Sequence, residues 1–274
     1  MAGKTALLVL AHQEKTSFNY AMNDVALQTL KQRGWNVLES DLYAQKFKST
    51  LSRDDIKGKL KDPNHFKYAV ETTLAWKEGR LSRDIVEEQK KIEAADLVIF
   101  QFPMYWFGLP SLLKGWVERV FTSGFAYSLQ EMYSNGPFTN KKAMLSFTTG
   151  ASESAFSPKG MHGDINAVLW PIQNGILNFC GFQVLPPQIS YAVSHIPQEA
   201  RTEMLENWKK RLENIWEEKP IQYIPVQDFD LPDCTLKKEI IEANSESRYG
   251  ITVGQHLGKA LPVDSQVKST DTKL

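Results

Sequence analysis

The stretch from Ala95 to Phe121 constrains the fold of this chain more than any other part of the sequence. It starts with a β-branched apolar run, Leu97–Phe102, which is typical of a strand covered on both faces in a parallel sheet. It ends with Ser111–Phe121, where apolar residues recur at the spacing of an amphipathic helix. The stretch therefore predicts a strand, a turn and a helix.

Bulky side chains fill the predicted turn, which runs from Met104 to Gly108 directly after the strand. In an open α/β sheet, ligands bind outside the carboxyl ends of the strands. Aromatic side chains at this place offer a flat apolar wall to a planar ring. One such residue alone would be read as a cap on the core, but four bulky residues in a row are hard to bury together. The turn therefore favours a site for a planar ligand over a cap on the core.

Composition argues against several classes of partner. The 274 residues include 32 basic and 32 acidic side chains, and this balance gives no electrostatic footprint for nucleic acid or an anionic membrane. Lys114 and two prolines interrupt the apolar stretch Leu97–Val117, so a membrane span is not expected there. The cysteines, Cys180 and Cys234, are typical of a reducing compartment rather than of a disulfide scaffold. We therefore expect a cytoplasmic protein.

Strand and helix patterns alternate along the chain as far as Pro220. We predict strands over residues 5–11, 35–42, 97–102, 142–147 and 183–193, and helices over residues 19–33, 81–94, 111–121, 168–179 and 198–218. Ser17 and Gly34 are the expected caps of the first helix. A long irregular excursion is expected over Tyr43–Gly79. This alternation predicts an α/β, flavodoxin-like, doubly wound fold with a parallel five-stranded sheet in the order 2-1-3-4-5.

The character of the sequence changes after Pro220, where prolines and polar residues become frequent. We predict a catalytic domain over residues 1–220 and a small C-terminal domain over residues 221–274. The second segment is too short and too polar to bury a core alone. It is therefore expected to pack on the main domain or on a partner subunit.

Three loops, over residues 12–18, 104–108 and 148–154, leave the carboxyl ends of predicted strands and would share one edge of the sheet. The first runs into a helix whose free N–H groups suit a phosphate, although Ser17 as an ordinary N-cap explains this loop as well. The third places hydroxyls and amides where they would meet a polar ring edge. Together the loops match a flavin, and ordinary core caps and loops explain them equally well.

Several motifs are absent from the sequence. There is no G-x-G-x-x-G and no G-x-x-x-x-G-K-[ST], which argues against a Rossmann dinucleotide site or a P-loop. No Cys/His cluster has zinc spacing, so no metal is expected. The lack of G-x-S-x-G argues against a serine nucleophile on an elbow.

Specific segments resemble the vertebrate NAD(P)H:quinone oxidoreductases, or DT-diaphorases, among them LVLAHQEKTSFNYAM, ADLVIFQFPMYWFGLPSLLKGWVERVF, LSFTTG and GQHLGKALP. The resemblance spans about Thr5 to Val267. The long C-terminal segment points to the branch that uses NADH or NADPH, rather than to a shorter paralogue that uses dihydronicotinamide riboside. The resemblance implies a flavodoxin-like homodimer that binds FAD and reduces quinones to hydroquinones. The hydride would pass through flavin N5 in a ping-pong cycle.

The resemblance also implies site residues by motif match. The cofactor-binding set is His12, Phe18, Asn19, Lys67, Pro103, Met104, Tyr105, Trp106, Phe107, Thr148, Thr149, Gly150, Ala151, Phe156, Arg201 and Leu205. The substrate-binding set is Ala126, Tyr127, Ser128, Leu129, Met132, His162 and His195. His162 and Phe156 stand where the family has a catalytic histidine–tyrosine pair.

This sequence departs from the family pattern near the reacting groups. Phe156 replaces the tyrosine and cannot donate a hydrogen bond, which to a charged acceptor is worth about 1.5–3 kcal/mol. We therefore expect hydride transfer to be about tenfold to a hundredfold slower unless water beside His162 compensates. Leu129 replaces a second tyrosine, Lys67 a glutamine and Ala151 a glycine. The alternatives are a flavin-binding dimeric interaction protein with weakened catalysis, or a reductase of the dihydronicotinamide-riboside type.

Overall fold

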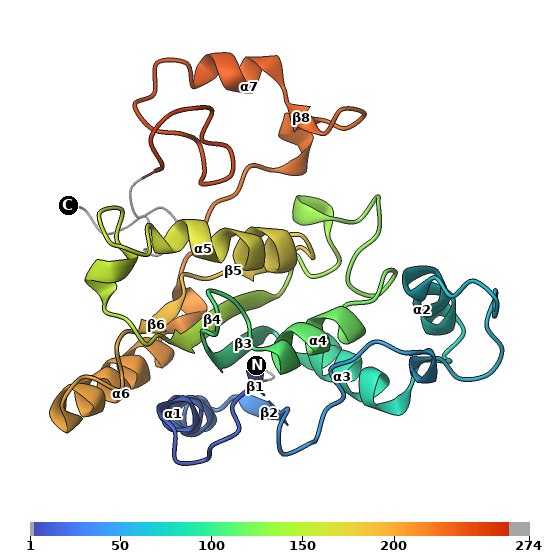
Figure 1. Ribbon diagram of the computed structural model, residues 1–274, viewed down its shortest axis with the longest axis horizontal. Coiled ribbons are helices and arrows are strands. Elements are labelled where there is room, and N and C mark those ends of the chain that lie inside the picture. The colour runs from blue at the N-terminus through green and yellow to red at the C-terminus, as the bar shows by residue number, and fades with distance from the viewer. Residues whose placement is uncertain (1–2, 263–274) are drawn as a thin grey trace.

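The structure is a computed structural model that describes residues 3–262 (Figure 1). Its centre is a parallel sheet in the order β2-β1-β3-β4-β5, with β6 beside β4. The strands of this sheet are β1 (Thr5–Leu10), β2 (Asn36–Asp41), β3 (Leu97–Pro103), β4 (Lys142–Thr148), β5 (Gln183–Val184) and β6 (Gln188–Ser190). The predicted fold class and strand order are confirmed.

Helices cover both faces of the sheet (Figure 1). They are α1 (Phe18–Gln32), α2 (Tyr68–Lys77), α3 (Arg83–Ala94), α4 (Ser111–Val120), α5 (Ile165–Ile172), α6 (Gln198–Leu212) and α7 (Lys238–Ala243). Ala6 and Leu8 of β1 pack with α1 and α6, whereas Leu7 and Val9 pack with α3, α4 and α5. Because successive side chains of a strand point to opposite faces, a strand covered on both sides must be apolar throughout.

The ends of α1 follow local sequence signals. The Ser17 hydroxyl accepts a hydrogen bond from the Tyr20 amide at 3.3 Å, as the N-cap prediction requires. Gly34 has φ +81°, and its amide donates to the Lys31 carbonyl while the Trp35 amide donates to the Leu30 carbonyl. These bonds form a Schellman motif, for which glycine is favoured because it enters the left-handed region without a steric penalty.

Three predicted boundaries are wrong. The strand expected over residues 183–193 is split into β5 and β6, because Pro186 and Pro187 have no N–H to donate to a ladder. The helix expected over residues 168–179 begins earlier, where Asp164 caps α5, and continues after Pro171 as a π-helix over Gln173–Asn178. The helix expected over residues 198–218 ends at Leu212, and the chain then turns so that Ile215 is buried.

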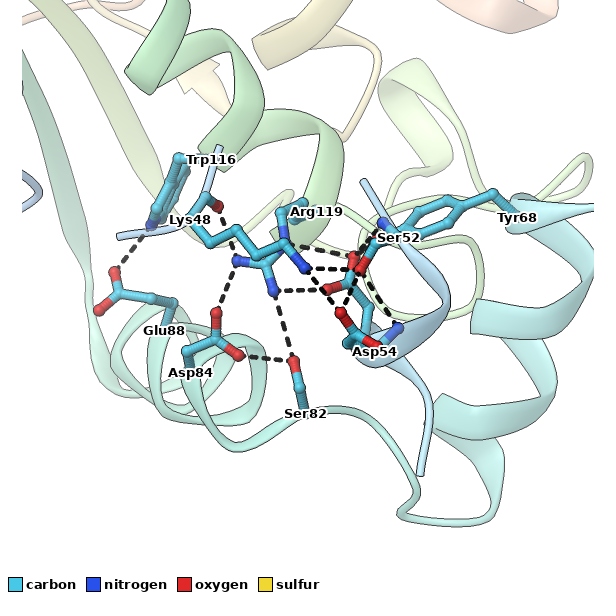
Figure 2. Close-up of polar contacts among 10 residues, drawn as sticks. Lys48, Ser52, Asp54, Tyr68, Ser82, Asp84, Glu88, Trp116 and Arg119 are labelled. Carbon is cyan, nitrogen blue, oxygen red and sulfur yellow. Dashed lines mark hydrogen bonds and ion pairs between the residues drawn. The ribbon is translucent and has the colours of Figure 1, made fainter. Parts of the chain in front are cut away.

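A buried cluster of charges around Arg119 fixes the excursion between β2 and α3 (Figure 2). The Arg119 guanidinium donates to Asp55 at 2.7 and 3.2 Å, to Asp84 at 2.6 Å and to the Lys48 carbonyl at 2.8 Å. The Tyr68 hydroxyl donates to Asp55 at 2.8 Å, which joins α2 to the same cluster. Burial alone would lower the pKa of Arg119, but the two carboxylates outweigh it and raise that pKa.

The C-terminal segment packs on the main domain of the same chain. Ile221 is buried in the main core, and its amide donates to the Val184 carbonyl at 2.8 Å. The Val226 amide donates to the Ser134 hydroxyl at 3.0 Å, and the Tyr223 ring lies 6.0 Å from the Trp170 ring of α5. The segment adds α7 and the hairpin of β7 (Phe229–Asp230) and β8 (Thr235–Leu236). Residues 263–274 of the predicted small domain lie outside the described residues.

Within residues 3–262, every helix is too short or too polar to traverse a bilayer.

Candidate functional site at the carboxyl edge of the sheet

Buried hydrogen bonds join the secondary-structure elements next to the three loops that the sequence predicts at one edge of the sheet. The Gln101 side-chain amide donates to the Asn19 carbonyl oxygen Oδ1 at 2.9 Å, and Asn19 Nδ2 donates to the Thr148 hydroxyl at 3.1 Å. The Met104 amide donates to the Thr148 carbonyl at 2.9 Å. These bonds connect the ends of α1, β3 and β4, so the prediction of a shared edge is confirmed.

The aromatic turn after β3 projects its side chains away from the core. Tyr105 and Gly108 close the turn with two backbone hydrogen bonds, and Trp106 and Phe107 have φ values of 50° and 60°. Bulky residues adopt this left-handed region at an energetic cost, and such strain clusters at functional sites. Trp106 is 98% exposed and Phe107 47%. Because these two rings are not caps on the core, the turn offers the flat apolar surface that a planar ligand requires.

Phe107, Phe156 and His162 form one aromatic cluster beside this turn. The ring centroid of His162 lies 5.2 Å from that of Phe107 and 4.9 Å from that of Phe156. The His162 amide donates to the Ala155 carbonyl at 2.9 Å, which holds the histidine near the turn. Phe156 is buried, and neither phenylalanine can donate a hydrogen bond. His162 is therefore the polar side chain of this cluster.

The loop after β4 presents a polar edge next to the turn. The Thr149 amide donates to the Ser190 carbonyl at 3.1 Å, and its hydroxyl donates to the Ala151 carbonyl at 2.8 Å. Gly150 is exposed, and a Cβ at that position would meet no atom within 4 Å. The backbone of this loop is therefore fixed while its outer side stays open to a ligand.

The loop before α1 is held by its own side chains. The Glu14 carboxylate accepts hydrogen bonds from the amide and the hydroxyl of Thr16, at 3.0 and 2.9 Å, and these bonds lower the pKa of Glu14. The Glu14 amide donates to Nδ1 of His12 at 3.0 Å. Ser17 is engaged in the cap, so the hydroxyls of Thr16 and Ser17 already have protein partners. Backbone N–H groups, His12 and the exposed Lys15 remain available to a phosphate at this loop.

The remaining residues of this edge come from the segment that follows β6. Arg201 in the first turn of α6 donates to the Val193 carbonyl at 3.3 Å and to the Gln198 side chain at 2.8 Å. Leu205 lies one turn further and packs on the same core cluster as Phe18. His195 is exposed in the loop before α6. These positions agree with a ligand that extends from the aromatic turn toward α1 and α6.

A second group of predicted site residues lies elsewhere in the chain. Tyr127 packs on Phe179 with ring centroids 5.3 Å apart, and the Tyr133 amide donates to the Phe179 carbonyl. Phe179 precedes β5, so this group lies at the amino edge of the sheet. The helix α4, which is 10 residues long and spans about 15 Å, returns the chain to that edge. No hydrogen bond or ring contact among the described residues joins this group to the carboxyl-edge group.

This second group also holds Lys67 of the predicted cofactor set and the predicted substrate residues Ala126, Ser128, Leu129 and Met132. The other two predicted substrate residues, His162 and His195, lie at the carboxyl edge. Lys67 is exposed at the start of α2, and α2 and Tyr127 line one shallow hollow. Leu129 is 85% exposed, whereas Ala126 is fully buried. Ser128 closes a turn with Glu131, and Met132 lines a cavity that it shares with the C-terminal segment.

Sequence reasoning missed three residues that support the site. Gln101 is a buried amide that links β3 to the start of α1, and the signal for it is a lone amide inside an apolar strand. The ring centroid of Tyr191 lies 6.2 Å from that of Phe156. The pKa of Tyr191 is raised to about 12 by burial and by the nearby carboxylates of Glu153 and Asp164. Phe179 contacts Tyr127 through folding alone, and no sequence pattern marks it.

Comparison with known proteins now identifies the family. Residues 4–212 match the family model described as a flavodoxin-like fold. The chain is 58% identical to the NAD(P)H dehydrogenase [quinone] 1 of Rattus norvegicus, over 98% of this chain and 99% of that protein. The chain belongs to the NAD(P)H:quinone oxidoreductase family.

Two further relatives of this family are informative. The human ribosyldihydronicotinamide dehydrogenase [quinone] is 47% identical, over 81% of this chain and 96% of that protein. A protein of Klebsiella pneumoniae that is assigned as a quinone reductase has a crystal structure with a TM-score of 0.83 and 36% identity, covering 86% of this chain and 95% of that one. The longer match with NAD(P)H dehydrogenase [quinone] 1 agrees with the expected branch.

Proposed function

We propose that this protein is an FAD-dependent NAD(P)H:quinone oxidoreductase that reduces quinones to hydroquinones. The observation that carries this proposal is the 58% identity, over nearly the full length of both chains, to NAD(P)H dehydrogenase [quinone] 1. Cytoplasmic residence and the division of the chain at about residue 220 are parts of the same proposal.

The residues at the carboxyl edge fit a flavin. Trp106 and Phe107 supply a flat apolar wall, and the open side of Gly150 leaves room for a ring beside fixed backbone amides. The start of α1 supplies N–H groups that suit a pyrophosphate. Arg201 and Leu205 lie where α6 packs on α1, which suits the far end of a dinucleotide.

In the proposed mechanism the chain binds and orients the reactants. When bound, the flavin would accept a hydride from the nicotinamide and then reduce the quinone by two electrons. Trp106 and Phe107 exclude water from one face of the reacting rings. His162, held 5.2 Å from Phe107, is the group that can stabilise developing charge or hold a proton there. Phe156 packs on His162 but provides no hydrogen bond to this site.

The separation of the two residue groups supports a homodimer. Tyr127, Leu129 and Lys67 lie on the side of the sheet opposite the aromatic turn, so they reach a flavin only if a second copy brings its turn to them. Trp106 and Leu129, which are almost fully exposed, are apolar side chains that such a contact would cover. Each of two sites would then combine the turn of one subunit with the Tyr127 group of the other.

Stopped-flow mixing of the purified protein with NADH, in the absence of oxygen, tests this proposal. We expect a yellow protein whose flavin absorbance bleaches within seconds and returns when a quinone is added. The same experiment with dihydronicotinamide riboside tests the alternative reductant. Faster bleaching with the riboside than with NADH and NADPH would assign the protein to that type. A purified protein without flavin that cannot be reconstituted with FAD would contradict the proposal.

Phe156 favours a second candidate function, a flavin-binding interaction protein with weak catalysis. In that case bleaching by NADH takes minutes. Phe156→Tyr then accelerates it about tenfold to a hundredfold, the range expected for restoring a hydrogen bond to a charged acceptor. Phe156→Leu is the matched control, since it changes the side chain without adding a donor. Equal rates in both variants would show that the missing hydroxyl does not limit the reaction.

A further inference from the structure

A mostly apolar cavity of about 320 Å³ lies between the main domain and the C-terminal segment. This volume falls within the range of small-molecule sites, which measure about 300–1,000 Å³. Its lining residues include Met132, Phe179, Tyr223, Val226, Leu231 and Cys234, and they come from the segment around η2 (Tyr133–Asn135), the α5 region and the C-terminal segment. No lysine, arginine, aspartate or glutamate is among them, so the cavity suits an uncharged apolar group.

The cavity adjoins the residues that the proposed function assigns to the quinone. Met132 is a predicted substrate residue and also lines the cavity. Phe179 lines it too, and the Phe179 ring contacts the Tyr127 ring at 5.3 Å. A quinone ring bound against Tyr127 would therefore have an apolar space directly behind Phe179 and Met132.

The wall of the cavity contains a buried polar group that has no hydrogen-bond partner among the described residues. The Tyr223 hydroxyl is buried and has no hydrogen-bond partner among the described residues. Most buried polar groups in folded proteins are hydrogen-bonded, so an unpaired hydroxyl in a cavity wall requires an explanation, and a bound molecule is one. Leu231 and Cys234 line the cavity and are both exposed, so we take the side of the cavity that they form as its mouth.

We propose that this cavity holds the apolar side chain of a quinone whose ring is bound near Tyr127, so that the protein prefers quinones with a short alkyl or prenyl chain. The inference rests on the proposed function, because it assigns a substrate class to the same site. The C-terminal residues Val226 and Leu231 then determine specificity, since they form the walls that a chain would contact.

Two quinones, one test variant and one control variant test the preference. The substrates are methylnaphthoquinone and the same ring with an added hexyl chain, and the readout is the ratio of their kcat/KM values. We expect the hexyl compound to be preferred by about tenfold or more, since even one methylene in an apolar pocket is worth about tenfold or more. Leu231→Trp, which fills the mouth from an exposed position, should bring the ratio close to one. Ile241→Trp, on the exposed face of α7, is the matched control and should leave the ratio unchanged.

A second measurement is independent of catalysis. Cys234 is exposed at the mouth, whereas Cys180 is buried and burial raises its pKa to about 12, so iodoacetamide should alkylate Cys234 selectively. Hexylbenzene, which carries a chain but no quinone, should slow this alkylation in the wild-type protein and not in Leu231→Trp.

The outcomes separate this inference from the proposed function. If both quinones are reduced and their ratio is the same in the wild type and in Leu231→Trp, the side-chain site is wrong. Val226→Phe, which narrows the cavity from inside, checks the same ratio should Leu231→Trp fold poorly. If no quinone is reduced, the proposed function fails and the alkylation assay decides the cavity. If hexylbenzene then fails to protect Cys234 from alkylation, the proposal that the cavity binds an apolar chain is refuted.

Discussion

Two buried polar regions of this protein differ in how their groups are satisfied. Around Arg119, the guanidinium and the Asp55 carboxylate are both 99% buried and bind each other, with Asp84, Lys48 and Tyr68 completing the bonds (Figure 2). In the α5 region, Gln173 is fully buried and neither atom of its amide has a partner among the described residues. The Tyr223 hydroxyl beside Trp170 is also unpaired.

The region around Arg119 therefore fixes the fold, whereas the α5 region keeps buried groups that lower the stability of the native state. A fully paired buried network holds the excursion in one geometry, and it becomes destabilising only when a partner is removed. Unpaired groups cost stability in the native state, and natural proteins accept such costs mainly near functional sites. The unpaired Tyr223 lines the proposed side-chain cavity, whereas no residue of the Arg119 cluster belongs to either residue group of the proposed reaction.

The largest expected effect comes from breaking the paired region. Asp55→Ala leaves Arg119 with a buried and partly uncompensated charge, which typically costs about 3–5 kcal/mol of unfolding free energy. Urea denaturation measures this loss. Asp54→Ala is the matched control, because Asp54 is 87% exposed and its ion pair with Lys48 should contribute less than about 1 kcal/mol. Similar losses in both variants would contradict a special role for the buried pair.

A smaller loss is expected for Tyr68→Phe. The hydroxyl of Tyr68 donates to the buried Asp55 carboxylate, and a bond to a charged group is worth about 1.5–3 kcal/mol. Urea denaturation should show this loss, together with faster proteolysis within residues 43–80, since this bond anchors α2. Unchanged stability would mean that the Arg119 cluster does not depend on α2.

Tyr223→Phe makes the same chemical change in the unpaired region and should have the opposite sign. Removing a buried hydroxyl without a partner relieves its desolvation cost, so the unfolding free energy should rise by about 1 kcal/mol. The two Tyr→Phe variants together test the comparison directly. A loss of stability for Tyr223→Phe would show that this hydroxyl is satisfied in solution.

The smallest effect concerns acid stability. Burial alone would raise the pKa of Asp84, but hydrogen bonds from Arg119 and Ser82 outweigh it and hold that pKa below its ordinary value. A carboxylate whose pKa is lowered by folding stabilises the protein above its unfolded pKa of about 3.9, and this contribution is lost as the pH falls through the folded pKa. Asp84→Asn should therefore flatten the decrease of the urea midpoint below about pH 4. If the urea midpoint of the variant falls as steeply as that of the wild type, other carboxylates cause the loss of stability in acid.

Residues close in sequence accounted for most of what could be predicted of the fold. The apolar runs of β1, β3 and β4, the cap at Ser17 and the glycine at Gly34 are local signals, and the structure confirms them. The predicted strand and helix boundaries were wrong where two local signals conflict. Pro186 and Pro187 interrupt an apolar run, and Pro171 lies inside a helix rather than at its start.

The site was predictable only in part. That three loops meet at one edge followed from parallel topology, since the carboxyl ends of parallel strands share an edge. The identity of the individual site residues came from the family resemblance, and their roles stay predictions. Neither source indicated that Gln101 binds Asn19 or that Phe179 packs on Tyr127.

The sequence by itself determined the sheet, its order and the edge that carries the candidate site, because periodic apolar patterns and turn residues act over a few neighbouring residues. Only the tertiary structure decided that Arg119 pairs with Asp55, 64 residues away, and that the Tyr127 group lies opposite the aromatic turn. It also decided that the C-terminal segment encloses a cavity. Such contacts depend on the path of the whole chain, which brings distant residues together only after the layers have packed.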